Sequence, residues 1–385
     1  MAKIKLGDLC KPSAGQIKED EDTLIDYIDI SSVDNETKKI TGYQTIIFGE
    51  SPSRARKVVK RGDILVSTVR PNLNAVALLE EDTPNVTVAS TGFCVLESKD
   101  DVDPRFIFNF CKSKPFIDDM VSQATGASYP AVSDKIVRSA LVPKYSYQEQ
   151  QSISSVLDKL TGIIDGRRTE LLELDNLIKA RFVELFGDPA HNERGWETLP
   201  VEKICKEIFG GGTPSKSHPE YYENGDIPWV SSKDMKSDVI TDSQIHINRL
   251  GVDNSTARMV PINSVIMVIR SGILKHTLPV AINSVPITVN QDLKVFIPNE
   301  KVLTRFMATQ FKMLERDILS GVRAVTADNI EFNSLKQRNM IVPPIKLQKE
   351  YVSFLEQVDK SKFAIQKALA KTQTLFDSLM QEYFG

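Results

Sequence analysis

Two proline-free stretches of the chain carry apolar residues at heptad spacing, which is the pattern of a long amphipathic helix. In residues 148–186 the seam positions are Leu157, Ile164, Leu171, Ile178 and Leu185. In residues 347–383 they are Val358, Ile365, Leu369, Phe376 and Leu379. Each stretch predicts a helix of about 60 Å at 1.5 Å per residue. A Phe-Gly pair closes both stretches, and glycine is a common helix stop.

Polar residues interrupt both seams, so neither is a continuous zipper: Arg167, Arg181, Lys362 and Thr372. Ordinary core packing would explain buried seams, but a helix of about 40 residues exceeds the usual globular length. We therefore expect the two helices to pack on each other as a spacer. Because the chain order is domain, helix, domain, helix, an antiparallel pairing would put the domains at opposite ends.

The rest of the chain consists of short apolar runs punctuated by Gly, Pro, Asn and Asp, which is typical of strands and turns. Residues 63–70, 86–96 and 260–270 are examples. The fold class expected is α+β, with two mixed α/β domains separated by two long antiparallel helices.

The two halves of the chain repeat each other at an offset of 200 residues. IDISS (28–32) matches PWVSS (228–232), ILVSTVR (64–70) matches SVIMVIR (264–270), and VDPRF (102–106) matches VLTRF (302–306). Several matches in order at one offset indicate a duplicated unit with a pseudo-twofold relation. The predicted division is a domain at 1–146, a helix at 147–188, a second domain at 189–345 and a second helix at 346–385.

Composition excludes several classes of protein. A chain of 385 residues with 41% hydrophobic and 26% charged residues is ordinary globular usage, and its net charge of −3 gives no global sign of nucleic-acid binding. The four cysteines lie far apart, against a disulfide framework or a zinc site. No apolar run is long enough to span a bilayer, so we expect a cytoplasmic protein with no membrane partner.

The enzyme motifs sought in the sequence are absent. The loop FGGGTPSK (209–216) resembles a phosphate-binding loop, but serine rather than glycine precedes its lysine and a proline removes one N–H donor. The histidines lack metal-ligand spacing, and no G-x-S-x-G elbow occurs. We expect no catalytic residue, cofactor or metal in this chain.

Basic and hydroxyl side chains gather at corresponding places in the two halves. Residues 51–71 hold six Lys or Arg and one Asp, and they lead into a strand that ends at Arg70. The second half keeps Arg270 at the matching position. Arginine suits bidentate contact with guanine or phosphate. A repeated structural ion pair is the alternative reading. Two polar loops, at 125–133 and 320–329, also recur and suit either close approach to a duplex or tight turns.

The sequence resembles the specificity subunits of type I restriction-modification systems over its whole length. The resemblance rests on the repeat, on FGGGTPSK leading to DIPWVSS (226–232), on LFGDPAHNERGW (185–196), and on a Val-Pro before each Gln/Glu-containing helix start. It implies that each domain reads one half of a split, asymmetric DNA sequence. It also implies that the helices set the gap and dock two methyltransferase subunits, which bind S-adenosylmethionine. Two restriction subunits, which use ATP and Mg, are the further partners it implies.

The residues expected at double-stranded DNA are Arg54, Arg56, Lys57, Ser67, Thr68, Arg70, Ser128, Tyr129, Gly211, Gly212, Thr213, Ser215, Lys216, Ser231, Ser232, Lys233, Arg258, Arg270, Ser271, Lys275 and Arg323. The glycines would let the backbone approach the duplex, or would only make a tight turn. A coiled-coil adaptor that binds proteins rather than DNA is the alternative function, and a nuclease is a third.

Overall fold

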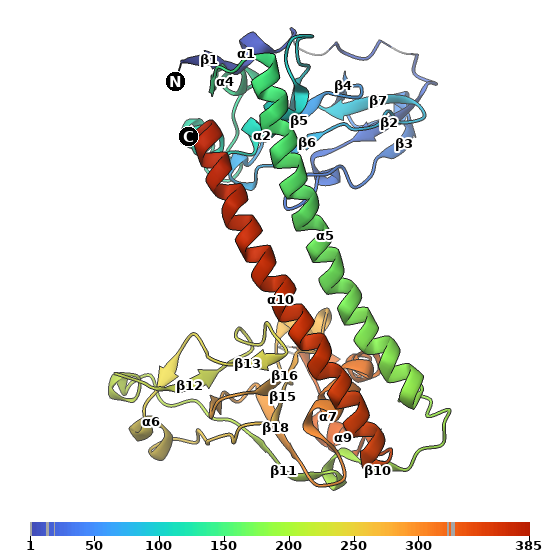
Figure 1. Cartoon of the computed structure of the whole chain (residues 1–385), viewed down its shortest axis with the longest axis vertical. Helices are drawn as coiled ribbons and strands as arrows, with labels where there is room; N and C mark the ends of the chain where they lie inside the picture. The colour runs from blue at the N-terminus through green and yellow to red at the C-terminus, as the bar shows by residue number, and fades with distance from the viewer. Residues whose placement is uncertain (1, 13–14, 19, 322, 325–327) are drawn as a thin grey trace. The chain divides into compact units, whose positions relative to one another are not determined.

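The computed structural model describes residues 2–12, 15–18, 20–321, 323–324 and 328–385. It divides into two compact units, which we describe one at a time. Unit 1 comprises residues 1–169 and 365–385, and unit 2 comprises residues 170–364. Each unit therefore holds one globular domain and a part of each long helix (Figure 1).

The two long helices are α5 (Tyr147–Phe186) and α10 (Ile345–Phe384), each of 40 residues. Their bounds agree with the heptad pattern to within two residues. Gly187 follows α5 with a left-handed φ of 75°, and its N–H donates to the carbonyl of Val183 at 2.8 Å. All of the predicted seam residues are buried or half-buried.

In unit 1 the two helices run antiparallel. Near the start of α5, the Tyr145 hydroxyl donates to the carbonyl of Tyr383 at 3.2 Å. Further along, Arg167 donates to the carbonyl of Ala368 at 2.7 Å and to the hydroxyl of Thr372. Two of the residues that interrupt the seams, Arg167 and Thr372, thus bond to each other.

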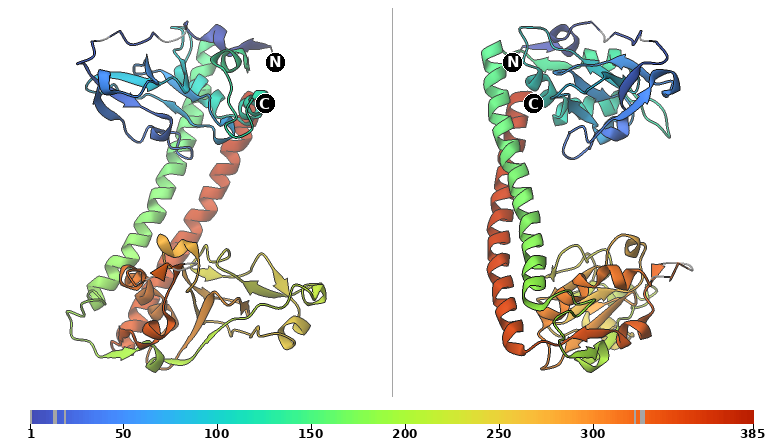
Figure 2. Two further views of the ribbon diagram at one scale, coloured as in Figure 1. Left: turned by 180° about the vertical axis from the view of Figure 1, so that it is seen from behind. Right: turned by 90° about the vertical axis from the view of Figure 1, so that its right-hand side faces the viewer.

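Unit 2 shows the same direction of pairing. Lys362 pairs with Asp175, and Arg181 pairs with Glu350 at 2.7 Å. In each unit taken alone, the globular domain lies along one side of the helix pair (Figure 2). The breaks in the heptad pattern are therefore polar links between the helices.

The domain of unit 1 is a mixed α/β fold. Its strands are β1 (Lys3–Lys5), β2 (Leu24–Ile28), β3 (Gln44–Ile47), β4 (Ala55–Val58), β5 (Ile64–Ser67), β6 (Val76–Leu78), β7 (Val86–Ser90), β8 (Phe93–Leu96) and β9 (Leu141–Pro143). Its helices are α1 (Leu6–Leu9), α2 (Pro104–Cys111), α3 (Lys114–Gln123) and α4 (Asp134–Ser139). The sheets have the orders β3-β2-β7-β4, β6-β5-β8 and β1-β9. Side chains of Asp103, Ser113 and Ser133 cap the N-termini of α2, α3 and α4.

The domain of unit 2 repeats this plan. Its strands are β10 (Thr198–Pro200), β11 (Cys205–Gly210), β12 (Ile227–Val230), β13 (Val239–Ile240), β14 (His246–Ile247), β15 (Val265–Val268), β16 (Val280–Asn283), β17 (Thr288–Val289), β18 (Leu293–Pro298), β19 (Arg323–Ala324), β20 (Asp328–Asn329) and β21 (Asn339–Ile341). Its helices are α6 (Arg249–Asp253), α7 (Thr304–Met313), α8 (Glu315–Leu319) and α9 (Phe332–Gln337). Strands β16, β15 and β18 neighbour one another as β6, β5 and β8 do, and β12 pairs parallel with β17 as β2 does with β7.

The ends of the long helices belong to the cores of the domains. In unit 1, Ile153, Leu157 and Phe384 share one buried cluster with residues of α2 and β5. In unit 2, Phe182 and Tyr351 are in the cluster formed by β15 and β18. The long helices therefore do more than contact each other, because their ends also anchor each domain.

No helix within the described residues is both long and apolar enough to cross a membrane.

Candidate nucleic-acid interface

In unit 1 the end of β5 and the polar loop at 125–131 meet at one corner. Val69 forms a bridge with Ala131, and the Arg70 N–H donates to the carbonyl of Pro130 at 2.7 Å. Arg70 has a left-handed φ of 50°, which turns the chain out of the strand. Its guanidinium carbon lies 4.9 Å from the ring centroid of Tyr129, whose side chain is 68% exposed. The structure thus brings two predicted residues, Arg70 and Tyr129, together on the surface; we call this the Arg70 corner.

Unit 2 has the corresponding corner. Arg270, at the end of β15, forms a bridge with Asn329, and the Ile330 N–H donates to the carbonyl of Ile269 at 2.9 Å. Both domains therefore tie a polar loop to the arginine that ends their central strand. Residues 322 and 325–327 of the second loop, and the side chain of Arg323 in β19, lie outside the described residues. We call this the Arg270 corner.

Two lysines that sequence reasoning missed gather beside Arg270. The Nζ atoms of Lys294 and Lys336 lie 4.7 and 5.2 Å from the ring centroid of Phe332. Burial and the neighbouring charges of Arg270 and Lys336 lower the pKa of Lys294. Within the described ranges, no carboxylate pairs with any of these cations. We call Arg270, Lys294 and Lys336 the Lys294 cluster; like charges held together without an acid favour a bound anion.

A signal for Lys294 was present in the repeat. Its strand β18 has buried Leu293 and Val295 on either side, and the matching position in the first half is the buried Cys94. Burial raises the pKa of the Cys94 thiol to about 12. When the two halves are compared, the second has a lysine where the first has a buried small residue. The second domain therefore has a charge at this position that the first domain lacks.

The basic run at 51–71 is only partly available to a ligand. Lys57 pairs with Asp134 at 2.6 Å and also donates to the carbonyl of Phe93. Arg56 is half-buried and donates to the carbonyl of Ala55, whereas Arg54 is exposed. The prediction that Lys57 faces DNA therefore conflicts with its place in an ion pair of the domain.

The hydroxyls of Ser67 and Thr68 are also occupied. Both residues are buried, and they donate to the carbonyls of Val69 and Gly92, each at 2.9 Å. Contrary to the prediction, these hydroxyls hold the Arg70 corner in place from inside and do not face a ligand. Ser128 is exposed on the loop beside Tyr129.

The glycine loop of unit 2 packs against its own domain. A Cβ on Gly211 would lie 1.8 Å from the carbonyl oxygen of Val289, and one on Gly212 would lie 2.2 Å from Thr256. Trp229 donates its indole N–H to the carbonyl of Gly212 at 2.9 Å. The close approach that these glycines permit is to protein backbone, so the proposed approach to DNA is replaced by a packing role.

The other predicted residues of unit 2 are mostly at the surface with local partners. Thr213 bonds Gln291, Ser215 bonds Ser217, Ser231 bonds Asp234, Arg258 pairs with Glu207, and the Ser271 hydroxyl accepts from the Ile273 N–H. Lys216, Lys233 and Lys275 are exposed, and Ser232 is half-buried. Arg258 also lies over the Phe209 ring at 4.1 Å. The structure thus does not gather these residues into a single cluster with Arg270.

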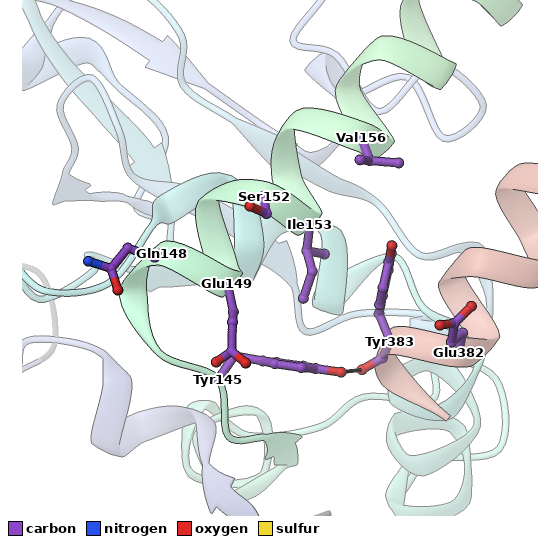
Figure 3. Close-up of a pocket in the computed structure, with 8 residues that line it drawn as sticks. All are labelled: Tyr145, Gln148, Glu149, Ser152, Ile153, Val156, Glu382 and Tyr383. Atoms are coloured by element: carbon purple, nitrogen blue, oxygen red, sulfur yellow. Dashed lines mark hydrogen bonds between the residues drawn. The ribbon is translucent and has the colours of Figure 1, made fainter.

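Unit 1 carries an open hollow where the start of α5 meets the end of α10 (Figure 3). Its volume is about 580 Å³, and it is lined by Tyr145, Gln148, Glu149, Ser152, Ile153, Val156, Glu382 and Tyr383. The lining mixes apolar, polar and acidic side chains, most of them on the two helices. Such a surface suits a protein partner better than a small ligand.

No group of three His, Cys, Asp or Glu side chains in the described part of the chain is arranged to hold a metal ion.

Comparisons with known proteins agree with the resemblance seen in the sequence. The family described as "Type I restriction modification DNA specificity domain" matches residues 1–175 and 193–373. The specificity subunit of the type I restriction enzyme EcoR124I/EcoR124II from Escherichia coli is 33% identical over 235 residues. That match covers 60% of this chain and 56% of the relative.

Two solved structures share the fold across the whole chain. A type I restriction-modification specificity subunit from M. genitalium has a TM-score of 0.62 at 13% identity and is 96% covered. A chain from a study of assembly and conformational transition in the type I system has a TM-score of 0.62 at 22% identity and is 97% covered. With the family matched over both halves, this chain belongs to the type I restriction-modification DNA specificity family.

Proposed function

We propose that this chain is the DNA sequence-specificity subunit of a type I restriction-modification complex. Each domain reads one half of a bipartite, asymmetric site, and the antiparallel helices set the gap between the halves. The observation that carries the proposal is the corner repeated in both domains, where an exposed arginine ends the central strand and a polar loop is tied to it. Arginine and tyrosine on such an edge can contact base edges and phosphates.

The two domains differ at this edge, which supports an asymmetric site. Unit 1 presents Arg70 stacked on Tyr129, whereas unit 2 presents Arg270 with Lys294 and Lys336. Different donors favour different base sequences. Local clusters of this kind are compatible with a net charge of −3, because the partners supply further phosphate contacts.

The partners dock on the helices. Leu172 and Phe363 are 65% and 68% exposed in unit 2, and the hollow beside Tyr145 lies on the helix ends of unit 1. Exposed apolar side chains on a helix pair are typical of protein interfaces. Two methyltransferase subunits bring S-adenosylmethionine, and two restriction subunits bring ATP and Mg. The chain itself performs no catalysis, and the complex acts in the cytoplasm, where the host DNA lies.

The test uses the complex purified after co-expression with its methyltransferase subunit. Arg70→Ala should relax base preference in one half-site, and Arg270→Ala should relax it in the other, each by about 1–3 kcal/mol. Methylation of a randomised target library reads both effects at once. A protein-binding adaptor would show no half-site effect in either variant, and that result would reject the proposal.

A further inference from the structure

A buried glutamine near the start of each long helix holds the first turn of a domain helix. In unit 1, Gln150 of α5 is 3% exposed. Its Oε1 accepts from the Asp103 N–H at 3.1 Å, just before α2, while its Nε2 donates to the carbonyl of Tyr145 at 3.0 Å. One side chain thus fixes the N-terminus of α2 against the N-terminus of α5.

Unit 2 repeats the contact with Gln348 of α10, which is 0% exposed. Its Oε1 accepts from the Leu303 N–H at 2.9 Å, just before α7. Its Nε2 donates to the carbonyls of Lys301 and Pro343 at 2.9 and 2.8 Å. The bond to Pro343 is buried and the other bonds of the two glutamines are partly buried, so loss of one partner is costly.

Each domain helix also carries an arginine that pairs with an aspartate of the long helix. This arginine stands two residues after the residue whose N–H the glutamine accepts. Arg105 of α2 pairs with Asp158 of α5 at 3.1 Å and also with Glu80 at 3.0 Å. Arg305 of α7 pairs with Asp359 of α10. These arginines are the fourth residues of VDPRF and VLTRF, so the repeated motif serves the domain–helix junction and not the DNA edge.

The aspartates lie on the same helix face as the glutamines. Asp158 is eight residues beyond Gln150, and Asp359 is eleven residues beyond Gln348. At 3.6 residues per turn these steps are about two and three turns. Each long helix therefore carries two polar attachment points, about 12 Å apart in α5 and about 16 Å apart in α10 at 1.5 Å per residue.

Aromatic packing joins each domain helix to the other long helix, α2 to α10 in unit 1 and α7 to α5 in unit 2. Phe106 lies 5.4 Å from Phe384, and Phe306 lies 4.9 Å from Phe186, measured between ring centroids. Apolar contact of this kind holds the domain on the helix pair but is not directional. Hydrogen bonds and ion pairs have defined geometry, so they fix the rotation of the domain about its helix.

We propose that each glutamine–arginine bracket, Gln150 with Arg105 and Gln348 with Arg305, is a set of positioning residues that fixes the angle of a recognition domain on its helix. The bracket would thereby determine which gap between half-sites the complex accepts. This inference rests on the proposed function.

The test measures methylation rates of the purified complex on duplexes with the native gap and with gaps one base pair longer or shorter. The Arg105→Met and Arg305→Met changes keep the apolar stem but remove the ion pair. Together they should reduce the preference for the native gap by about twofold to fivefold, the range expected for partly exposed ion pairs.

Arg181→Met is the matched control. Arg181 pairs with Glu350 between the long helices of unit 2, and its side chain is 28% exposed against 27% for Arg305. Its removal should leave the gap preference as in the wild type. Exchanging the charges in Arg305→Asp with Asp359→Arg should restore the preference that Arg305→Met weakens. Asp158→Asn and Asp359→Asn are milder changes for use if the methionine variants fail to assemble.

The outcomes separate the two claims. If the wild-type complex methylates without any split site, the proposed function fails. If the wild type reads a split site and the assembled bracket variants keep its gap preference unchanged, only the bracket inference fails. A gap preference that falls in Arg181→Met as much as in the bracket variants would also overturn it.

Discussion

The Lys294 cluster should contribute to DNA affinity through phosphate contacts, which the Lys294→Met and Lys336→Met double variant removes. Each lysine lies over the Phe332 ring, a contact of about 0.5–1 kcal/mol. Methionine sulfur on an aromatic ring contributes about 0.3–1.5 kcal/mol. Burial, and then repulsion from Arg270 and Lys336, lower the pKa of Lys294, and the substitution removes both costs. The variant should therefore fold with nearly unchanged stability.

The expected size of the binding effect follows from counterion release. Removing one lysine–phosphate interaction lowers the slope of log affinity against log salt by about 0.9, and removing two lowers it by about 1.8. Between about 50 and 200 mM salt, the wild-type affinity should then fall about 12-fold more than that of the variant.

The assay is DNA binding by the full complex, followed by fluorescence anisotropy over a salt series. Lys112→Met is the control, because Lys112 also lies over a ring, 4.2 Å from the Phe108 centroid, but belongs to unit 1 and is not among the residues expected at DNA. Burial lowers the pKa of Lys112 to about 8. An unchanged salt slope in the double variant, with the complex intact, would refute the assignment of phosphate contacts to these lysines.

Three further predictions concern stability. Asp63 is buried, and desolvation raises its pKa to about 6, so the folded state binds more protons than the unfolded state between about pH 4 and 6. Stability should therefore fall as pH rises through that window, and denaturant unfolding of an Asp63→Asn variant should lack this fall. Gly212→Ala should destabilise unit 2 by about 2 kcal/mol or more in a thermal melt, because its Cβ would lie 2.2 Å from Thr256. Gly272→Ala is the control and should be nearly neutral, because nothing lies within 4 Å of its Cβ. Phe186→Ala removes a fully buried ring at the end of α5 and should cost about 3–5 kcal/mol, and a destabilisation below about 1 kcal/mol would contradict the core assigned to that helix end.

The long helices could be predicted because the heptad pattern is local and extends over 40 residues. The partners of the seam residues could not be predicted, because Leu157 and Leu185 pack with domain residues far away in the sequence. The repeat identified Arg70 and Arg270, and the structure places both at exposed strand ends.

The remaining site residues show where sequence patterns are ambiguous. Strand β5 is buried along its whole length, so alternation could not tell which side of Ser67 faces solvent. A glycine requirement indicates close approach but not the approaching atoms, which for Gly211 are the backbone of Val289. Lys294 was missed because Cys94 stands at the matching position of the first half, so the residues that the two halves share do not reveal this lysine.

Whether the two domains read two halves of one DNA site can be decided by mapping methylated adenines on DNA modified in vivo by the wild-type chain together with its methyltransferase subunit. We expect a single consensus made of two different half-sites separated by a constant number of unread base pairs. A continuous consensus, or methylation without any sequence preference, would contradict this division of the molecule into two readers and a spacer.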